Sequence, residues 1–283
     1  MQTFPLIGGR QLALAFTVAL GAVTTMTAAA TAATLKVTID NLAPANGGLL
    51  TPVWVGFHDG SFDLYNRGES LDGFPGMEAL VEDGITAPLT DNFALTTPDG
   101  VQGTLLSEGI PPLEVGESTS FIFEVDASNQ YFSYASMVIP SNDAFIANGN
   151  PFAHEIFDDA GNFIGADFIV TGAEVLDGGT EVNDEAAFST AFLGQAAPNT
   201  GDDEAGVVEL HPGLVEGGRI LSTTDSTPFN GLPLNFTGAD FTAPGYEVAR
   251  IRVEKVPEPG TILGLLVFGG SLVTAAHKRK QSI

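Results

Sequence analysis

The sequence predicts an all-β protein in which the strands form a sandwich with long loops. Six apolar runs have the length of a strand, and turn-forming residues bound them. The chain contains 34 glycines and 17 prolines, which are residues that terminate strands and form turns. It has 20 phenylalanines but a single tryptophan, which indicates a core lined largely by phenylalanine. Successive strands without alternating helices are typical of sheets packed on sheets.

Four of the runs alternate between apolar and other residues, so one face of each strand is expected to point into the core. The expected inward side chains are Leu35, Val37 and Ile39; Val53, Val55 and Phe57; Phe121, Phe123 and Val125; and Ala249, Ile251 and Val253. Two further runs, over residues 132–140 and 165–176, also have the length of a strand.

A single short helix is predicted, in the segment PGMEALVEDG. Pro75 favours the first turn of this helix, and Gly84 favours its end. No internal repeat and no linker divide residues 34–256, so this region is expected to form one domain.

Residues 1–33 have the layout of a secretory signal peptide. They contain one basic residue, Arg10, and no acidic residue; a short apolar run follows, and then the small-residue run TTMTAAATAA. Ala28 and Ala30, or Ala30 and Ala32, would form the cleavage site. The alternative is a first membrane anchor, for which the apolar run is shorter than the roughly 20 residues that a spanning helix needs.

The C-terminal segment 257–283 has three parts. Pro257, Glu258 and Pro259 form an extended, exposed stretch because both prolines fix φ. The run Thr261–Ala276 has 16 residues without a charge, which is short for a transmembrane helix, and the basic cluster 278–280 follows. Because basic residues stay on the cytoplasmic side, the domain would lie outside the membrane. An ordinary membrane anchor would also explain the apolar run and the basic tip.

The order of these parts resembles the PEP-CTERM sorting signal of Gram-negative bacteria. The resemblance implies that a membrane exosortase removes the tail after export. It also implies that the protein reaches the cell envelope, the cell surface or the extracellular polymer. The partners implied are the exosortase and export machinery, with extracellular polysaccharide or surface matrix as a further candidate. The membrane would be contacted only through the transient C-terminal helix.

Charge and composition exclude several classes of function. Residues 34–256 contain 34 of the 35 acidic residues but six of the ten basic residues. Such a domain is repelled by nucleic acid, whose phosphates need basic contacts, and by anionic lipid unless a cation bridges them. The absence of cysteine excludes disulfides, thiol catalysis and iron–sulfur clusters.

Catalytic motifs are not found, and no enzyme activity is predicted. His58, His154, His211 and His277 form no H-E-x-x-H motif, and no G-x-S-x-G elbow occurs. A Ser/His/Asp triad stays open, since its members need not be close in the chain. With this many acidic residues, a carboxylate pair is expected by chance and does not indicate a glycosidase.

Four acidic clusters combine carboxylates with Asn and Gly: they surround Asp143, Asp158, Asp177 and Asp202. Clustered carboxylates and carbonyls are the ligands that calcium prefers, but none of the clusters has EF-hand spacing. Solvated turns are the alternative, because Asp, Asn and Gly favour turns. The clusters FDDAGN and NTGDDEAG are interpreted as turns, and LDGGTEVNDE as a source of ligands.

Three segments together resemble the spondin domain in motif and order. They are residues 35–84 (LKVTIDNLAPANGG through VEDG), MVIPSNDAFIANG and LDGGTEVNDE, and the resemblance covers about residues 34–215. It implies an antiparallel β-sandwich of about eight strands, an extracellular matrix or adhesion role and no enzyme chemistry. It also implies one calcium ion held by Asp143, Asp177 and Glu181. Asp184 is a candidate fourth ligand.

The sequence departs from the family pattern in three features. Ala144 stands where the animal members have an aromatic residue, and their disulfides are absent here. Glu181 replaces Asp and lengthens one ligand by a methylene. The sequence therefore predicts an exported, non-catalytic surface or matrix protein. The alternatives are a secreted hydrolase acting on matrix polysaccharide, marked by a deep pocket with convergent carboxylates, and a small-molecule binding module, marked by an apolar concavity.

Overall fold

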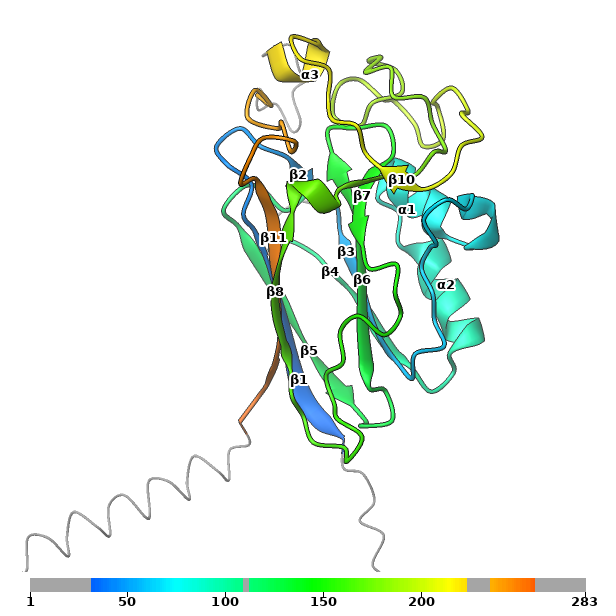
Figure 1. The fold of residues 1–283 in the computed structure, drawn as a ribbon, viewed down its shortest axis with the longest axis vertical. Coiled ribbons are helices and arrows are strands. Elements are labelled where there is room, and N and C mark those ends of the chain that lie inside the picture. Colours follow the sequence, from blue (N-terminus) through cyan, green and yellow to red (C-terminus); the bar gives the residue numbers. More distant parts are fainter. Residues whose placement is uncertain (1–31, 109–111, 223–234, 258–283) are drawn as a thin grey trace, which may run out of the picture.

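A computed structural model describes residues 32–108, 112–222 and 235–257 of the chain. Two antiparallel sheets and a few short helices make up this region, which confirms the predicted all-β sandwich (Figure 1). The signal peptide prediction and the sorting signal fall almost entirely outside the described residues, which include only Pro257 of the Pro-Glu-Pro motif. Among the described residues, no helix has the length and apolar character needed to cross a membrane.

The first sheet has four strands in the order β5-β1-β11-β8. Their bounds are β1 Ala33–Asn41, β5 Ser118–Val125, β8 Ala166–Thr171 and β11 Glu247–Lys255. Strands β1 and β11 are the first and last of the described chain, and they pair antiparallel with Val37 opposite Val253. This pairing places the first and last described strands side by side in one sheet.

The second sheet has seven strands in the order β10-β9-β7-β6-β3-β4, and β2 also pairs with β6. Their bounds are β2 Leu49–Leu50, β3 Val53–His58, β4 Val101–Leu105, β6 Tyr131–Ile139, β7 Ala144–Ala147, β9 Leu176–Asp177 and β10 Glu209–Leu210. Three of the eleven described strands have only two residues, and the other eight are longer.

Between the two sheets lies the main apolar core. It buries the predicted inward faces of three strands: Leu35, Val37 and Ile39; Val53, Val55 and Phe57; and Ala249, Ile251 and Val253. The prediction for Phe121 is wrong, because 57% of this residue is exposed. Phe123 and Val125, the other two predicted inward residues of β5, are buried as predicted, so on this edge strand the prediction fails at one position.

Helices cover the outer face of the second sheet as a third layer (Figure 1). Helix α1 (Met77–Asp83) ends at Gly84, whose φ of 65° is left-handed, as the sequence predicts. Helix α2 (Ala87–Thr96) was not predicted: Thr, Asp and Asn occupy much of it, and only Leu89 and Phe93 are buried. Phe93 of α2 packs edge-on against Trp54 at a ring-centroid distance of 5.3 Å, and α1 packs on β6 and β7 in the same apolar cluster. Strand β3 is therefore buried on both faces.

The run 165–176 is broken into two strands that belong to different sheets. Strand β8 ends at Thr171, a 3-10 turn η2 (Gly172–Glu174) follows, and β9 begins at Leu176. Glu174 accepts hydrogen bonds from the Thr171 amide at 2.8 Å and from its hydroxyl at 2.7 Å, which fixes the turn. This crossing brings Asp177 next to the loop that joins β6 to β7.

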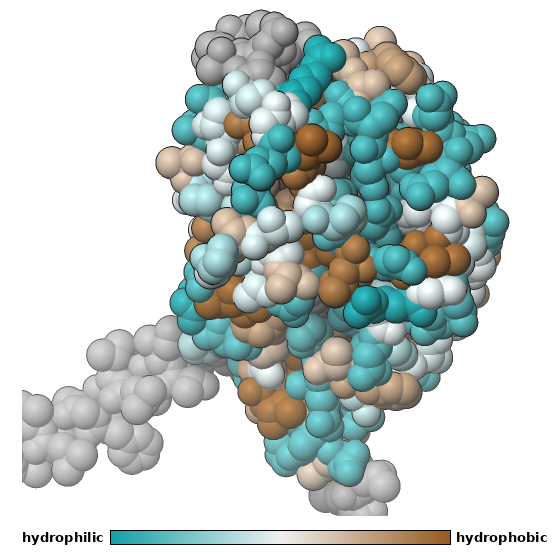
Figure 2. Space-filling view, turned by 45° about the horizontal axis from the view of Figure 1, so that its top comes forward, coloured by the Kyte–Doolittle hydropathy of each residue, from teal (hydrophilic) through white to brown (hydrophobic). Residues whose placement is uncertain are grey.

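Long loops cover one end of the sandwich, together with the short helix α3 (Arg219–Ser222) (Figure 1). A separate apolar cluster, with Leu49, Met137 and Ile220 among its members, lies beneath these loops. On the face shown in Figure 2, apolar side chains form separate patches among hydrophilic ones. Two further short elements, η1 (Leu71–Gly73) and η2, complete the described secondary structure.

Candidate functional site

Asp143 lies in the loop between β6 and β7 and is fully buried. Its Oδ2 accepts hydrogen bonds from the backbone amides of Thr180 at 2.8 Å and Glu181 at 3.2 Å, and from the Thr180 hydroxyl at 3.2 Å. Its Oδ1 is buried without a hydrogen-bond partner. One carboxylate oxygen thus anchors the loop that follows β9, and the other oxygen is left free.

Asp177 ends β9 beside Asp143, because Ala144 of β7 pairs with Asp177. The Asp177 carboxylate accepts hydrogen bonds from the Gly179 amide at 2.8 Å and from the Asn183 side chain. Gly179 has a φ of 65°, and a Cβ there would lie 2.6 Å from the Val207 backbone nitrogen. The turn after Asp177 therefore needs glycine at this position and returns the chain toward Asp143.

Glu181 follows this turn and is 2% exposed. Its Oε1 accepts a hydrogen bond from the Gly201 amide at 2.8 Å, and its Oε2 is buried without a partner. A Cβ at Gly201 would lie 2.1–2.3 Å from the Glu181 carboxyl group, so a side chain at this position would displace that carboxyl group. The acidic segment NTGDDEAG thus lines the candidate site through its backbone, since Val182 also donates to the Asp202 carbonyl.

Burial and mutual repulsion raise the pKa values of this cluster. The pKa of Asp143 rises to about 6, first because the group is buried and then because of the charge of Asp177. The pKa of Glu181 rises to about 7, mainly through burial, with a further contribution from Asp143. Glu82 of α1 joins the cluster: burial and the charge of Glu181 raise its pKa to about 7.

No described ion pair neutralises these carboxyl groups. The two salt bridges of the described residues, Arg250–Asp167 and Arg252–Asp40, lie on the four-stranded sheet. The described site is therefore a cluster of buried carboxyl groups without a basic partner. Hydrogen bonds from amides and hydroxyls are the described interactions that stabilise their negative charge.

Asp184 does not belong to the buried acidic cluster. It is exposed, and its Oδ1 accepts hydrogen bonds from the Ala186 amide at 2.8 Å and the Ser189 hydroxyl at 3.2 Å. The next residue, Glu185, is buried and accepts from the amides of Val215 at 2.8 Å and Ile220 at 3.1 Å, so it ties the loops together. Sequence reasoning missed the burial of both Glu82 and Glu185.

As placed, the site is not a complete metal centre. The described part of the chain contains no group of three or more His, Cys, Asp or Glu side chains arranged to hold a metal ion. It does contain two buried carboxylate oxygens without partners, on Asp143 and Glu181, and carboxylate oxygens are hard ligands suited to calcium. The donor chemistry fits calcium, and Asp177 is the nearest further carboxylate on the paired strand.

Three of the four histidines lie among the described residues, and two of these, His58 and His154, lie apart from the acidic site. His58 is fully buried, and its ring contacts the Ser133 hydroxyl at 2.8 Å and accepts from the Gly60 amide at 3.0 Å. Burial lowers the pKa of His58, and that of His154, to about 4. The His58–Ser133 pair has no exposed surface, and the ring nitrogen that would face a triad carboxylate is already engaged by an amide.

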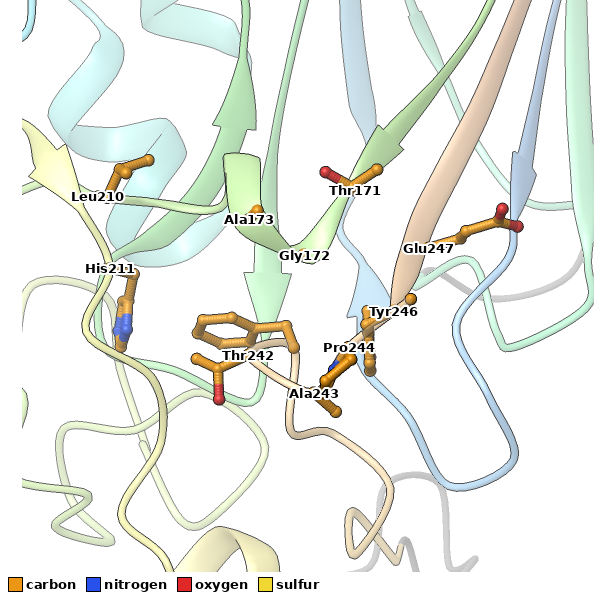
Figure 3. Close-up of a pocket in the computed structure, with 12 residues that line it drawn as sticks. Thr171, Gly172, Ala173, Leu210, His211, Thr242, Ala243, Pro244, Tyr246 and Glu247 are labelled. Carbon is orange, nitrogen blue, oxygen red and sulfur yellow. The ribbon is translucent and has the colours of Figure 1, made fainter.

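A pocket of about 570 Å³ lies where the end of β10, the η2 turn and the segment leading into β11 meet (Figure 3). Leu210 and His211 form one side of it, the turn around Gly172 forms another, and residues 241–247 form the third. Comparison with known proteins adds no relative: no family model matches the chain, and no curated protein does.

Proposed function

We propose that the protein is an exported, non-catalytic structural or adhesion protein of the cell surface or extracellular matrix, with a spondin-like sandwich that binds calcium. The observation that carries the proposal is the pair of buried, unpartnered carboxylate oxygens on Asp143 and Glu181. Unsatisfied buried oxygens are costly, and a cation that binds both of them would remove this cost.

In this proposal Asp143, Glu181 and Asp177 hold the ion, and water completes its coordination. Asp184, which the sequence offered as a fourth ligand, is engaged with Ala186 and Ser189 and is not needed. When bound, the ion supplies positive charge that the described cluster lacks. It would fasten the β6–β7 loop to the turn after β9, since Asp143 already accepts hydrogen bonds from Thr180 and Glu181.

Thermal unfolding of the full chain with calcium and with chelator tests this proposal. An ion that binds only the folded state adds about 2.7 kcal/mol at a hundredfold excess over its dissociation constant. We expect a higher melting temperature with calcium, and Asp177→Ala should lose most of the difference. Asp184→Ala is the matched control and should keep it. Identical melting curves with calcium and with chelator would overturn the calcium proposal.

The export part of the proposal is supported by the sequence of the two end segments. The signal-like residues 1–33 and the Pro-Glu-Pro, apolar and basic parts of 257–283 flank a domain whose first and last strands pair with each other. Cleavage of both end segments would therefore leave every strand of the domain in place. The strongly acidic surface keeps an exported domain soluble through self-repulsion.

A hydrolase is the less favoured alternative. None of the described carboxyl groups with raised pKa values lines the 570 Å³ pocket; they are Asp63, Glu82, Asp83, Asp143 and Glu181. Among the described residues that line the pocket, Glu247 is the acidic one. A panel of glycan, ester and peptide substrates tests the non-catalytic reading. Turnover that disappears in His58→Ala, His154→Ala or His211→Ala would contradict it.

A further inference from the structure

Strand β5 forms one edge of the four-stranded sheet and is the longest edge strand among the described residues. It pairs with β1 from Ser118 to Val125 without a register shift. No described backbone group forms a hydrogen bond with its other side. A straight, unpaired edge of this length is a template on which a further strand can pair.

The other edges of the two sheets carry features that oppose strand addition. Strand β8 has a register shift against β11 and carries the charged Asp167. Strand β4 has five residues, one of which is Gly103, and β10 has two. By contrast, the segment Ser118–Phe123 of β5 contains no charge, proline or glycine, and it is rich in residues that favour strands.

The direction of the free backbone groups follows from the pairing with β1. The Asn41 amide donates a hydrogen bond to the Glu117 carbonyl at 2.9 Å. Because antiparallel pairing alternates, the odd-numbered residues of β5 exchange hydrogen bonds with β1. The even-numbered residues therefore direct their N–H and C=O groups toward the open edge. These are Ser118, Ser120, Ile122 and Glu124, and all of them are exposed.

Two large apolar side chains of β5 are also exposed, Phe121 at 57% and Ile122 at 53%. By alternation, Phe121 lies on the same face as the buried Phe123, and the two ring centroids are 5.0 Å apart. Ile122 lies on the opposite face. The open edge thus has an uncovered apolar side chain on each face, and one added strand would contact both.

We propose that β5 pairs antiparallel with β5 of a second copy of this chain, which joins the two four-stranded sheets into one continuous sheet. Opposed residues of an antiparallel pair point to the same face, so Phe121 lies opposite an odd-numbered residue. The register with Phe121 opposite its own symmetry mate uses the free backbone groups of all four even-numbered residues. The register centred on Ile122 leaves those of Ser118 unpaired.

The side chains of β5 match one another in this register. The two Phe121 rings meet at the twofold axis, where the Cα atoms of such a pair are about 4.5 Å apart, and cross-strand aromatic pairs are stabilising. Ile122 lies opposite Ser120. Glu124 is the one charged residue of the strand, and it lies opposite Ser118, so no like charges meet. This inference goes beyond the calcium proposal and does not depend on it, since Asp143 and Asp177 belong to the other sheet and its loops.

Sedimentation velocity of the full chain over a range of concentrations tests this pairing, in non-ionic detergent so that the apolar end segments stay dispersed. We expect a monomer–dimer equilibrium. Phe121→Lys places two like charges opposite each other at the axis and should weaken dimerisation about tenfold. Because Phe121 is exposed, the melting temperature of this variant should stay close to that of the wild type. Leu95→Lys is the matched control: it makes the same change of charge at a residue of α2 that is 83% exposed, and it should dimerise as the wild type does.

Cysteine cross-linking gives an independent test, because the chain contains no cysteine of its own. In the proposed register the two Cα atoms of residue 121 lie within the range that a disulfide spans. Phe121→Cys should therefore form a disulfide-linked dimer under mild oxidation, and Leu95→Cys should not. The proposal is overturned if the wild type stays monomeric, if Phe121→Lys dimerises as strongly as the wild type, or if the two cysteine variants cross-link equally.

Discussion

Replacing Glu181 with glutamine tests the electrostatics of the acidic site. Glu181 is 2% exposed, and its pKa in the folded protein is about 7, against an ordinary value of 4.5. A carboxyl whose pKa is raised by folding contributes stability that is fully present below its unfolded value and is lost as the pH rises through its folded value. For Glu181 the loss occurs between about pH 4.5 and 7 and amounts to about 3 kcal/mol.

Glu181→Gln keeps an oxygen that can accept from the Gly201 amide and removes the titration. In chelator, the free energy of unfolding of the variant should therefore fall less between pH 4.5 and 8 than that of the wild type, by about 3 kcal/mol. The pKa values of Asp143 and Glu82 are also raised, so the free energy of unfolding of the variant will still fall to some extent as the pH rises.

Urea unfolding at a series of pH values measures this difference. Glu204→Gln is the matched control, because Glu204 is an exposed carboxylate in the neighbouring segment 199–206. It should leave the pH dependence of the wild type unchanged. If Glu181→Gln has the same pH dependence as the wild type, the assignment of a buried, protonatable carboxyl at this position is wrong.

Three further predictions concern the core, the η2 turn and the tail. Phe57→Ala should cost about 3–5 kcal/mol in urea unfolding, because the ring is fully buried and packs edge-on against Phe123 at a centroid distance of 5.3 Å; a loss below about 1 kcal/mol would contradict this packing. Gly172→Ala should lower the melting temperature strongly, because its Cβ would lie 1.9 Å from the Phe241 carbonyl oxygen; a wild-type melting temperature would show that the turn can move. Intact-mass measurement of the native surface protein should find residues 261–283 missing, and a mature protein that retains them would support the plain anchor instead.

Alternation in the sequence predicts the strands well where both neighbours of a strand are present. Strands β1, β3 and β11 lie inside their sheets, so an inward side chain such as Val55 or Ile251 is covered on every side. On the edge strand β5 the same pattern predicts Phe123 and Val125 correctly but not Phe121, which is exposed, because pattern alone does not show how far the facing sheet covers an edge strand. Helix α2 escaped prediction because its tertiary contacts through Leu89 and Phe93 stabilise a segment of modest helix propensity.

At the acidic site, sequence reasoning identified residues that the fold brings into contact and others that it separates. Asp143 hydrogen-bonds to the Glu181 amide, and Asp177 lies on the paired strand, whereas Asp184 turns outward. Glu82 was missed because a glutamate in a short helix carries no local signal of burial; only its packing beside Thr180 and Glu181 shows its role.

Calorimetric titration of calcium into the chelator-stripped full chain tests the central claim most directly. At about pH 6.5, carboxyl groups with raised pKa values are partly protonated, so calcium binding should release protons and give a heat that depends on the buffer. We predict one ion per wild-type chain, and binding that is lost in Asp143→Asn, whose side chain can still accept from the Thr180 amide. No calcium binding by the wild type, or binding of equal strength by Asp143→Asn, would contradict the proposed site.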